Sequence, residues 1–290
     1  MRPDDLRFSP QPFGSPAGRA PVRVTWLGTA GFALEHAGTT VLIDPYVTRA
    51  SLWCCVRAPL QSDATAVARW TPRADAIVAG HTHFDHALDV PAIARATGAM
   101  VYGSRSCAAL CNAEGVAAER VVDVETTMRE EPVQAEVGPF ALRFVPSAHS
   151  ALLLGRVPFP GDIADCDQVP LRAQGYRCGA VFGVEIRVAG LRLYHLGSAN
   201  LLDAHGVSGV DLLLMCVAGW TTTANFVDRV LGAFAPRAIL LSHWDDFFRP
   251  MERGARPLPA IALPRLVDAL TVTDPGVRLG TVPIGDTVVL

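Results

Sequence analysis

The stretch AIVAGHTHFDH, residues 76–86, joins a short apolar strand directly to a cluster of metal-binding side chains. His81 and His83 are two residues apart, so an extended backbone places both on one side. Asp85 and His86 come after the bend and can face a second cation. Neutral imidazole and carboxylate groups are ligands of zinc and other borderline metals. The spacing therefore predicts a metal site, and a polar surface loop is the alternative interpretation.

Two further histidines come directly after strand-like segments. His149 follows the alternating segment 136–148, and His243 follows the apolar segment 238–242. A single histidine at the end of a strand is more often structural than a ligand. Strands of one layered sheet end on a common edge, however, and sites gather there. We therefore expect His149 and His243 to join the cluster at residues 81–86.

The remaining chain alternates between strand-rich and mixed segments. Residues 22–45 alternate apolar and polar side chains around glycine-containing turns, which is typical of a β-meander. Capping signals and periodicity predict helices at 89–98, 106–114, 223–234 and 261–270. Strands are predicted at 99–104, 121–124, 136–150, 181–200, 210–220 and 238–244. The two halves each run from β-rich to α/β, which predicts an α/β fold of two sheets packed face to face with helices outside.

Length and composition limit the protein class. The chain has 290 residues, of which 50% are hydrophobic and 18% are charged, which suits one large domain. The net charge is −3, every basic residue is arginine, and no basic stripe appears, so we expect no nucleic acid partner. We expect no membrane span, because no apolar run approaches the roughly 18 residues that one needs. The first residues lack an apolar signal-peptide core and the seven cysteines form no CxxC pair, which predicts a reduced cytoplasmic protein.

Two segments have no regular period. Residues 1–20 are rich in proline, glycine, serine and arginine, and are predicted to form a flexible N-terminal arm. A single domain is predicted over 21–290. Within it, residues 152–179 are predicted to be a lid insertion, because long loops without periodicity in compact domains are usually functional.

The whole pattern resembles the metallo-β-lactamase superfamily. The residues that carry the resemblance are HTHFDH at 81–86, AHS with His149, LSH with His243, and the opening TWLGTAGF with VLIDP at 41–45. Their order and spacing look most like the branch that includes the ascorbate-6-phosphate lactonase and N-acyl-phosphatidylethanolamine phospholipase D families. The resemblance covers about residues 22–250 and implies a four-layer αβ/βα sandwich with a binuclear metal site along one edge.

The resemblance also implies a role for each matching residue. The first metal would be held by His81, His83 and His149, and the second by Asp85, His86 and His243. Asp44 matches a carboxylate that braces the ligand loop from behind. The implied cofactor is zinc, as two ions of which one is bound more weakly, with manganese or iron as alternatives.

One position departs from the family pattern. Ser198 stands where the family usually has an aspartate that bridges both metals, and a neutral hydroxyl is a poor ligand. Three outcomes are open: two ions held less tightly, one ion only, or a replacement carboxylate from Asp203, Asp245 or Asp246. We expect two ions, because the other ligands are present.

Aromatic side chains after two of the ligands predict an apolar substrate pocket. The predicted lining residues are Phe159 in the lid, together with Trp244, Phe247, Phe248 and Arg249, which follow His243. These side chains lie within about ten residues of a predicted metal ligand. Because exposed apolar surface lowers solubility, we expect them to line the substrate pocket. Arg249 is expected to offer a charge to an anionic group. Packing of the same residues in the core is the alternative.

These observations predict a zinc-dependent hydrolase that uses metal-bound hydroxide on a small ester, lactone, thioester or amide with an apolar portion. Asp85 is the predicted catalytic residue, because it can orient the attacking water. The alternatives are a phosphodiesterase acting on a small or lipid-like phosphodiester, a degenerate metal-binding protein without turnover, and a diiron redox protein. That last branch normally has a glutamate where this chain has His83. The expected partner is a small-molecule substrate, and the sequence leaves an oligomer open.

Overall fold

The fold is built on two seven-stranded mixed β-sheets that pack face to face. The computed structural model describes residues 3–13, 20–127, 133–152, 155–164, 169–203 and 206–290. Both sheets repeat one design, in which an antiparallel meander continues into a parallel half. The predicted α/β sandwich of two mixed sheets is confirmed.

The strands of each sheet follow the chain closely. The first sheet has the order β14 (Thr287–Val289), β1 (Arg23–Gly28), β2 (Gly31–His36), β3 (Thr39–Ile43), β4 (Ala76–Val78), β5 (Met100–Gly103) and β6 (Val121–Asp123). The second has the order β13 (Arg278–Gly280), β12 (Ala238–Ser242), β11 (Leu212–Cys216), β10 (Leu191–Leu196), β9 (Phe182–Val188), β8 (Phe140–Pro146) and β7 (Gln134–Val137). The strand β14, which the sequence did not predict, returns the end of the described chain to the first sheet beside β1.

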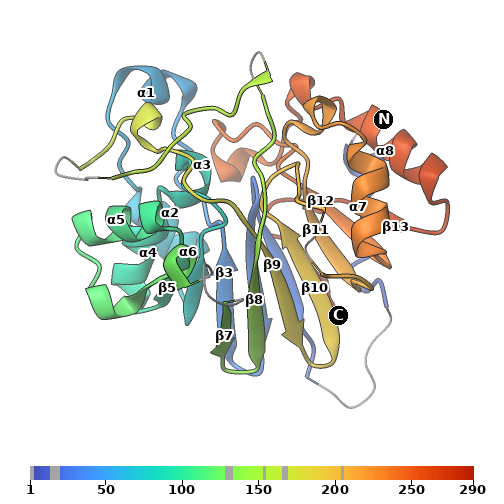
Figure 1. The fold of residues 1–290 in the computed structure, drawn as a ribbon, viewed down its shortest axis with the longest axis horizontal. Helices are drawn as coiled ribbons and strands as arrows, with labels where there is room; N and C mark the ends of the chain where they lie inside the picture. Colours follow the sequence, from blue (N-terminus) through green and yellow to red (C-terminus); the bar gives the residue numbers. More distant parts are fainter. Residues whose placement is uncertain (1–2, 14–19, 128–132, 153–154, 165–168, 204–205) are drawn as a thin grey trace.

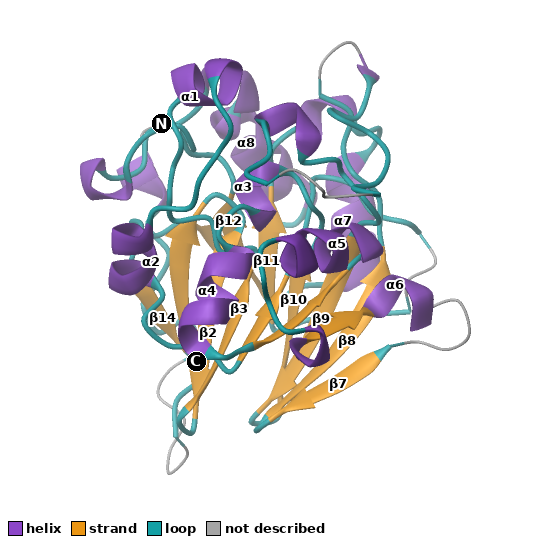
Figure 2. Cartoon of the chain, turned by 90° about the vertical axis from the view of Figure 1, so that its left-hand side faces the viewer, coloured by secondary structure: helices purple, strands orange, loops and turns teal. Residues whose placement is uncertain are grey.

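Helices cover the outer faces of both sheets, which makes four layers (Figures 1 and 2). The helices that precede the second sheet in the chain are α1 (Leu52–Arg57), α2 (Ala64–Trp70), α3 (Phe84–Ala87), α4 (Val90–Thr97), α5 (Arg105–Ala113) and α6 (Val124–Thr127). Those beside the second sheet are α7 (Phe226–Phe234) and α8 (Leu263–Thr273). Short 3-10 turns lie at Pro3–Leu6, Ala118–Arg120, Ala173–Gly175, Trp220–Thr222, Met251–Arg253 and Pro259–Ile261. Of the four predicted helices, α4 and α5 match within a residue or two, whereas α1 and α2 were not predicted, although Ser51 and Asp63 cap their first turns.

The packing follows from the burial pattern of the strands. The strands β4, β11 and β12 are buried along their whole length, as expected of parallel strands covered on both faces. One large apolar cluster fills the space between the sheets and extends under α7 and α8, while a second lies between the first sheet and α4 and α5. Within the described residues, no helix is both long and apolar enough to cross a membrane.

Helix α4 is held in place by a buried carboxylate at its start. Asp89 precedes the helix and accepts hydrogen bonds from the backbone N–H groups of Val47 and Thr48 at 2.7 and 2.8 Å. Its carboxylate also accepts the Ser62 hydroxyl. Gly98 ends the helix with a left-handed φ of +73°, which a glycine adopts without steric cost. The helix that follows the HTHFDH loop is therefore locked to the loop after β3.

The strand ends gather the residues with metal-binding chemistry at one end of the sandwich. His81 follows β4, His149 follows β8, Ser198 follows β10 and His243 follows β12. Figure 2 shows α3, which carries Asp85 and His86, at the end of the strands where these loops meet. The described part of the predicted lid, residues 152–179, contains no strand or α-helix, and it lies at this same end of the molecule.

Part of the predicted arm packs against the domain. Phe8 is buried, and its backbone N–H donates to the Thr281 carbonyl at 2.8 Å. The Val289 N–H donates to the Pro10 carbonyl at 2.8 Å. Residues 7–10 thus lie against the C-terminal strands, whose edge backbone groups bind them, and the flexibility of the arm stays a prediction. Residues 14–19 lie outside the described part of the chain.

The docked arm leads to a stability prediction. Phe8→Ala should lower the free energy of unfolding by about 3 kcal/mol, because it removes a buried aromatic ring and leaves a cavity. Ser9→Ala, at an exposed neighbouring position, should change it by less than about 0.5 kcal/mol. Chemical denaturation of both variants checks this. Equal stability of Phe8→Ala and the wild type would show that the arm is not docked.

Candidate metal centre

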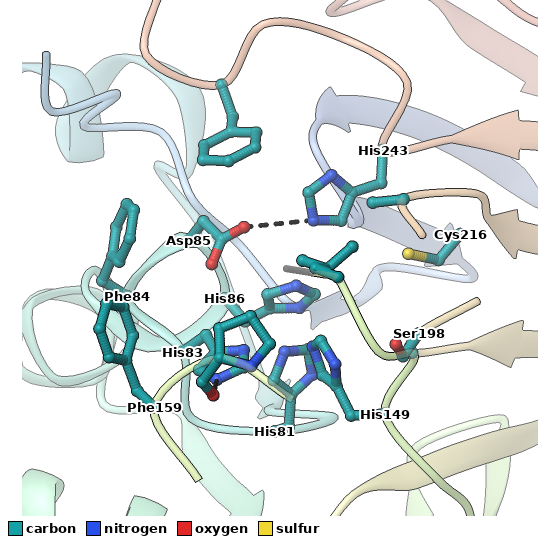
Figure 3. Close-up of a pocket in the computed structure, with 15 residues that line it drawn as sticks. His81, His83, Phe84, Asp85, His86, His149, Phe159, Ser198, Cys216 and His243 are labelled. Atoms are coloured by element: carbon teal, nitrogen blue, oxygen red, sulfur yellow. Dashed lines mark hydrogen bonds and ion pairs between the residues drawn. The ribbon is translucent and has the colours of Figure 1, made fainter. Parts of the chain in front are cut away.

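Six side chains converge at the sheet edge in two groups of three. His81, His83 and His149 form one group, and Asp85, His86 and His243 form the other. Within each group, the possible ligand atoms all lie within 4.8 Å of one another. Figure 3 shows the imidazoles of the first group facing one another below the Asp85–His243 pair. All six residues that the sequence predicted as ligands are brought together in this way.

The two groups adjoin each other. The ring centroids of His81 and His86, which belong to different groups, are 3.8 Å apart, and His86 lies 5.4 Å from His243. His81 is 1% exposed, and neither of its ring nitrogens has a hydrogen-bond partner in the described structure. Buried polar nitrogens without a partner are costly, so each calls for an explanation. A metal ion fits this set of donors, since imidazole nitrogen and carboxylate oxygen are its ordinary ligands.

Burial keeps the first group of imidazoles neutral. Desolvation lowers the pKa of His81 and the pKa of His83, and their histidine neighbours lower the pKa of His81 further. For His149, desolvation and the proximity of His83 lower the pKa to about 3. Neutral imidazole is the form that binds metals. These three rings are therefore in the ligating state throughout the physiological pH range.

Three of the candidate ligand histidines are each oriented by a hydrogen bond from one ring nitrogen. His83 Nε2 donates to the Pro158 carbonyl at 2.8 Å, and His149 Nδ1 donates to the Ser150 carbonyl at 2.7 Å. His86 Nδ1 donates to Asp44 Oδ2 at 2.9 Å. Such bonds fix the tautomer and leave the second nitrogen available for a metal.

Asp44 occupies the bracing position that the sequence predicted. It is fully buried, its Oδ1 accepts the Gly80 N–H at 2.6 Å, and its own backbone has a left-handed φ of +45°. Although desolvation lowers the pKa of His86, the Asp44 charge and hydrogen bond outweigh it, and the net pKa of His86 is raised. Asp44 thus fixes both the backbone before His81 and the ring of His86.

Asp85 and His243 face each other across the cavity. Asp85 Oδ2 lies 3.2 Å from His243 Nε2, the contact that is dashed in Figure 3. Burial alone would raise the pKa of Asp85, but the His243 hydrogen bond and the charges of neighbouring histidines lower it well below its usual value. Asp85 is therefore an ionised carboxylate that supplies negative charge to the second group.

Ser198 lies where a bridging carboxylate was expected, and it has a different structural task. It is buried, and its Oγ accepts the Ser150 N–H at 3.0 Å. The Ser150 carbonyl in turn accepts the ring N–H of His149. The hydroxyl thus binds the backbone of the residue whose carbonyl orients a candidate ligand of the first group.

None of the three aspartates considered as replacements lines the cavity within the described residues. Asp245 is fully buried in an ion pair with Arg49, and Asp203 is exposed beside Arg229. Asp246 accepts the backbone N–H of Phe248. Asp85 is thus the one carboxylate among the described lining residues, and the third sequence-based outcome is wrong.

The cavity above the two groups is small and mainly apolar. Its volume is about 130 Å³. Besides the six candidate ligands and Ser198, its described walls are Phe84, Leu152, Pro158, Phe159, Gly197, Cys216, Ala218 and Phe247. No arginine is among the described lining residues.

Two of the predicted pocket residues lie at the cavity. Phe159 is 38% exposed, and its ring packs edge-on to His83 at 6.4 Å between centroids. Phe247 packs edge-on to His243 at 5.4 Å. Both rings contact a candidate ligand from the side of the cavity opening.

Three of the predicted pocket residues do not line the cavity, and these predictions are corrected. Trp244 is 1% exposed, and its indole N–H donates to Thr281 Oγ1 at 2.9 Å on the opposite side of the strand end. Phe248 packs behind Phe247 at 4.4 Å, and Arg249 donates to the Arg253 carbonyl at 3.0 Å. Successive side chains after the end of a strand point in alternating directions. Proximity to His243 in the sequence therefore did not decide which of these aromatic side chains face the site.

One residue at the site carries chemistry that the sequence did not assign, and a buried histidine on the neighbouring strand does not reach the cavity. Cys216 ends β11 between Ser198 and His243, and its thiol lines the cavity wall, where burial raises its pKa (Figure 3). His195 is buried on β10 and donates from Nε2 to the Ala30 carbonyl at 2.9 Å, so it supports the loop after β1 and is not part of the cavity. Strand register placed both residues, and no local motif marks them.

Comparisons with known proteins agree with this geometry. Residues 23–242 match the family model of the beta-lactamase superfamily domain. A UPF0173 metal-dependent hydrolase of Anaeromyxobacter sp. (strain K) is 28% identical over 239 residues, which cover 80% of this chain and 77% of the relative.

Solved structures share the fold at lower sequence identity. Igni18, a metallo hydrolase of Ignicoccus hospitalis, superposes with a TM-score of 0.55 at 17% identity, covering 93% of this chain and 98% of its own. CmlA, a diiron β-hydroxylase of Streptomyces venezuelae, gives 0.55 at 15% identity, covering 95% of this chain and 55% of its own. At these identities the likeness shows the fold alone, and the resemblance to particular branches stays a prediction. The family match over residues 23–242, on a sandwich that carries the paired ligand groups at its edge, shows that the chain belongs to the metallo-β-lactamase superfamily.

Proposed function

We propose that the protein is a zinc-dependent hydrolase that binds two ions and cleaves a small, uncharged ester, lactone, thioester or amide. The observation that carries the proposal is the pair of adjacent ligand groups at the floor of a small apolar cavity. Membership of the superfamily and the metal-dependent hydrolase names of the relatives support the reaction class. A zinc ion bound there would lower the pKa of water and polarise a carbonyl oxygen.

The residues of the chain have distinct tasks in this reaction. The neutral rings of His81, His83 and His149 offer nitrogen ligands without adding charge. Asp85 adds the one negative charge among the described lining residues, and its carboxylate can accept a hydrogen bond from the attacking water. The second group contains this charge, but Ser198 stands in place of the carboxylate that would bridge both ions. We therefore propose that this group holds the more weakly bound ion.

The walls of the cavity favour a neutral substrate over a phosphodiester. Phosphoryl groups are usually bound by arginine or lysine, and no such residue is among the described lining residues. The nearest aromatic and aliphatic side chains, Phe159, Phe247 and Leu152, instead offer apolar contacts around the opening. These walls exclude water and place the apolar part of the substrate beside the ligand groups.

The metal content of the protein tests the two-ion proposal. Protein purified without chelator should contain about two zinc-class ions per chain by elemental analysis, and chelator should remove one of them faster. Ser198→Asp should slow the faster loss, because it adds a carboxylate beside both groups. Ser198→Ala is the matched control and should not slow it. Less than about half an equivalent of any transition metal would contradict the proposal.

Asp85→Asn tests the catalytic task. Turnover should fall by about a hundredfold or more, because general acid–base groups contribute typically 10²–10⁴-fold. The control is Asp203→Asn, which alters an exposed carboxylate paired with Arg229 and should leave the rate unchanged. A folded, metal-loaded Asp85→Asn protein with near wild-type turnover would remove Asp85 from the mechanism.

The apolar walls predict a dependence on acyl chain length. kcat/KM for neutral acyl esters should rise about fourfold per added methylene, the equivalent of about 0.8 kcal/mol, until the small cavity is filled. Phe159→Ala should flatten this rise. Phe248→Ala, which removes a ring packed behind the lining, should lower thermal stability and keep the rise. A flat profile in the wild type would contradict the apolar-substrate proposal.

A further inference from the structure

The ligand His243 is held differently from the ligands with oriented rings. Its Nε2 faces Asp85, and its Nδ1 is buried without a hydrogen-bond partner in the described structure. The rings of His83, His86 and His149 each have such a partner. The orientation of His243 therefore depends on its backbone, which has a left-handed φ of +57° that L-residues rarely adopt. Something around it must keep this backbone in place.

The backbone of His243 is held by the loop between β1 and β2. The His243 N–H donates to the Thr29 carbonyl at 2.7 Å. The Thr29 N–H donates to Asp245 Oδ1 at 3.0 Å, so the Thr29 residue is bound on both sides by the segment 243–245. Thr29 itself has a left-handed φ of +50°. Two strained residues from distant parts of the chain thus stabilise each other.

A buried ion pair completes this arrangement. Asp245 Oδ2 binds Arg49 Nη1 at 2.8 Å, and both side chains are almost fully buried, at 1% exposure for Arg49 and 0% for Asp245. Arg49 also has a left-handed φ, of +51°. Its guanidinium lies against Gly28, where an added Cβ would come within 1.7 Å of Nη2. The arginine therefore packs directly on the loop that holds His243.

We infer that Arg49 and Asp245 are positioning residues for the second metal, and that they act by fixing the backbone of His243 through Thr29. The inference rests on the proposed binuclear site. It also explains why Asp245, two residues from a ligand, does not itself face the cavity: its two oxygens are engaged by Arg49 and Thr29. The first ligand group does not share these contacts, because its members follow β4 and β8.

The test measures the two metal affinities separately. Zinc competition against a chromophoric chelator measures both affinities. Arg49→Met should lower the affinity for the second ion by about 10- to 100-fold, which is the usual effect of removing a residue that supports a metal ligand. The first ion should keep its wild-type affinity. Cobalt-loaded protein should lose the visible absorption of the second ion and retain that of the first.

Further variants keep the test decisive if Arg49→Met folds poorly by leaving a buried carboxylate unpaired. The double variant Arg49→Met with Asp245→Asn removes both charges and keeps an oxygen for the Thr29 N–H. It should fold and show a smaller loss of the second ion. Glu185→Gln is the control, since Glu185 is a buried carboxylate that binds Arg143 at 2.7 Å and is not among the described lining residues. It should leave both affinities unchanged.

The outcomes separate the inference from the function on which it rests. Variants that lower thermal stability but keep both affinities, or that weaken both ions equally, would show a purely structural pair and overturn the inference. A wild-type protein that binds a single ion would instead contradict the proposed binuclear site.

Discussion

The hydrogen bonds of the buried Asp44 carboxylate connect the parts of the molecule on which the site depends. One oxygen holds the Gly80 N–H, which precedes the first ligand, and the other holds the ring of His86. The loop that follows β3 is thereby tied to the loop that follows β4, and the parallel pairing of these strands sets the distance between them. Without this carboxylate, two ligands from different groups would lose their common support.

The two ligand groups are supported by different means. Carbonyls of the lid and of the loop after β8 orient the first group, through Pro158 and Ser150. The position of the lid and the geometry of His83 are therefore coupled. The second group depends on carboxylates, with Asp44 behind His86 and Asp245 behind the backbone of His243. This difference is a physical basis for the proposal that two ions bind with unequal affinity.

The sequence predicted the ligands because strand periodicity and histidine placement coincide. His149 and His243 lie far from residues 81–86 in the chain, yet each follows a strand, and strands of packed sheets share an edge. The strands from β8 to β12 were predictable from their local periodicity, and α4 and α5 from their local capping signals, whereas β13 was not predicted. The family resemblance added the grouping of the ligands and the task of Asp44.

The features that the sequence did not predict depend on the direction in which a side chain points, or on contacts between residues far apart in the chain. Trp244 and Phe247 are both aromatic and close to His243, but one packs against Trp26 in the core and the other reaches the cavity. Arg49 and Asp245 pair across 196 positions, and neither belongs to a recognisable motif. Residues 7–10 looked like a free arm because their partners, Thr281 and Val289, come at the other end of the chain.

We propose above that the two groups hold two ions side by side at one cavity floor. Anomalous X-ray diffraction from zinc-loaded crystals, collected on both sides of the zinc absorption edge, tests it most directly. We expect two peaks about 3.5–4 Å apart, as in other two-metal sites, one beside His81, His83 and His149 and one beside Asp85, His86 and His243. A single peak, or peaks away from these six residues, would contradict it.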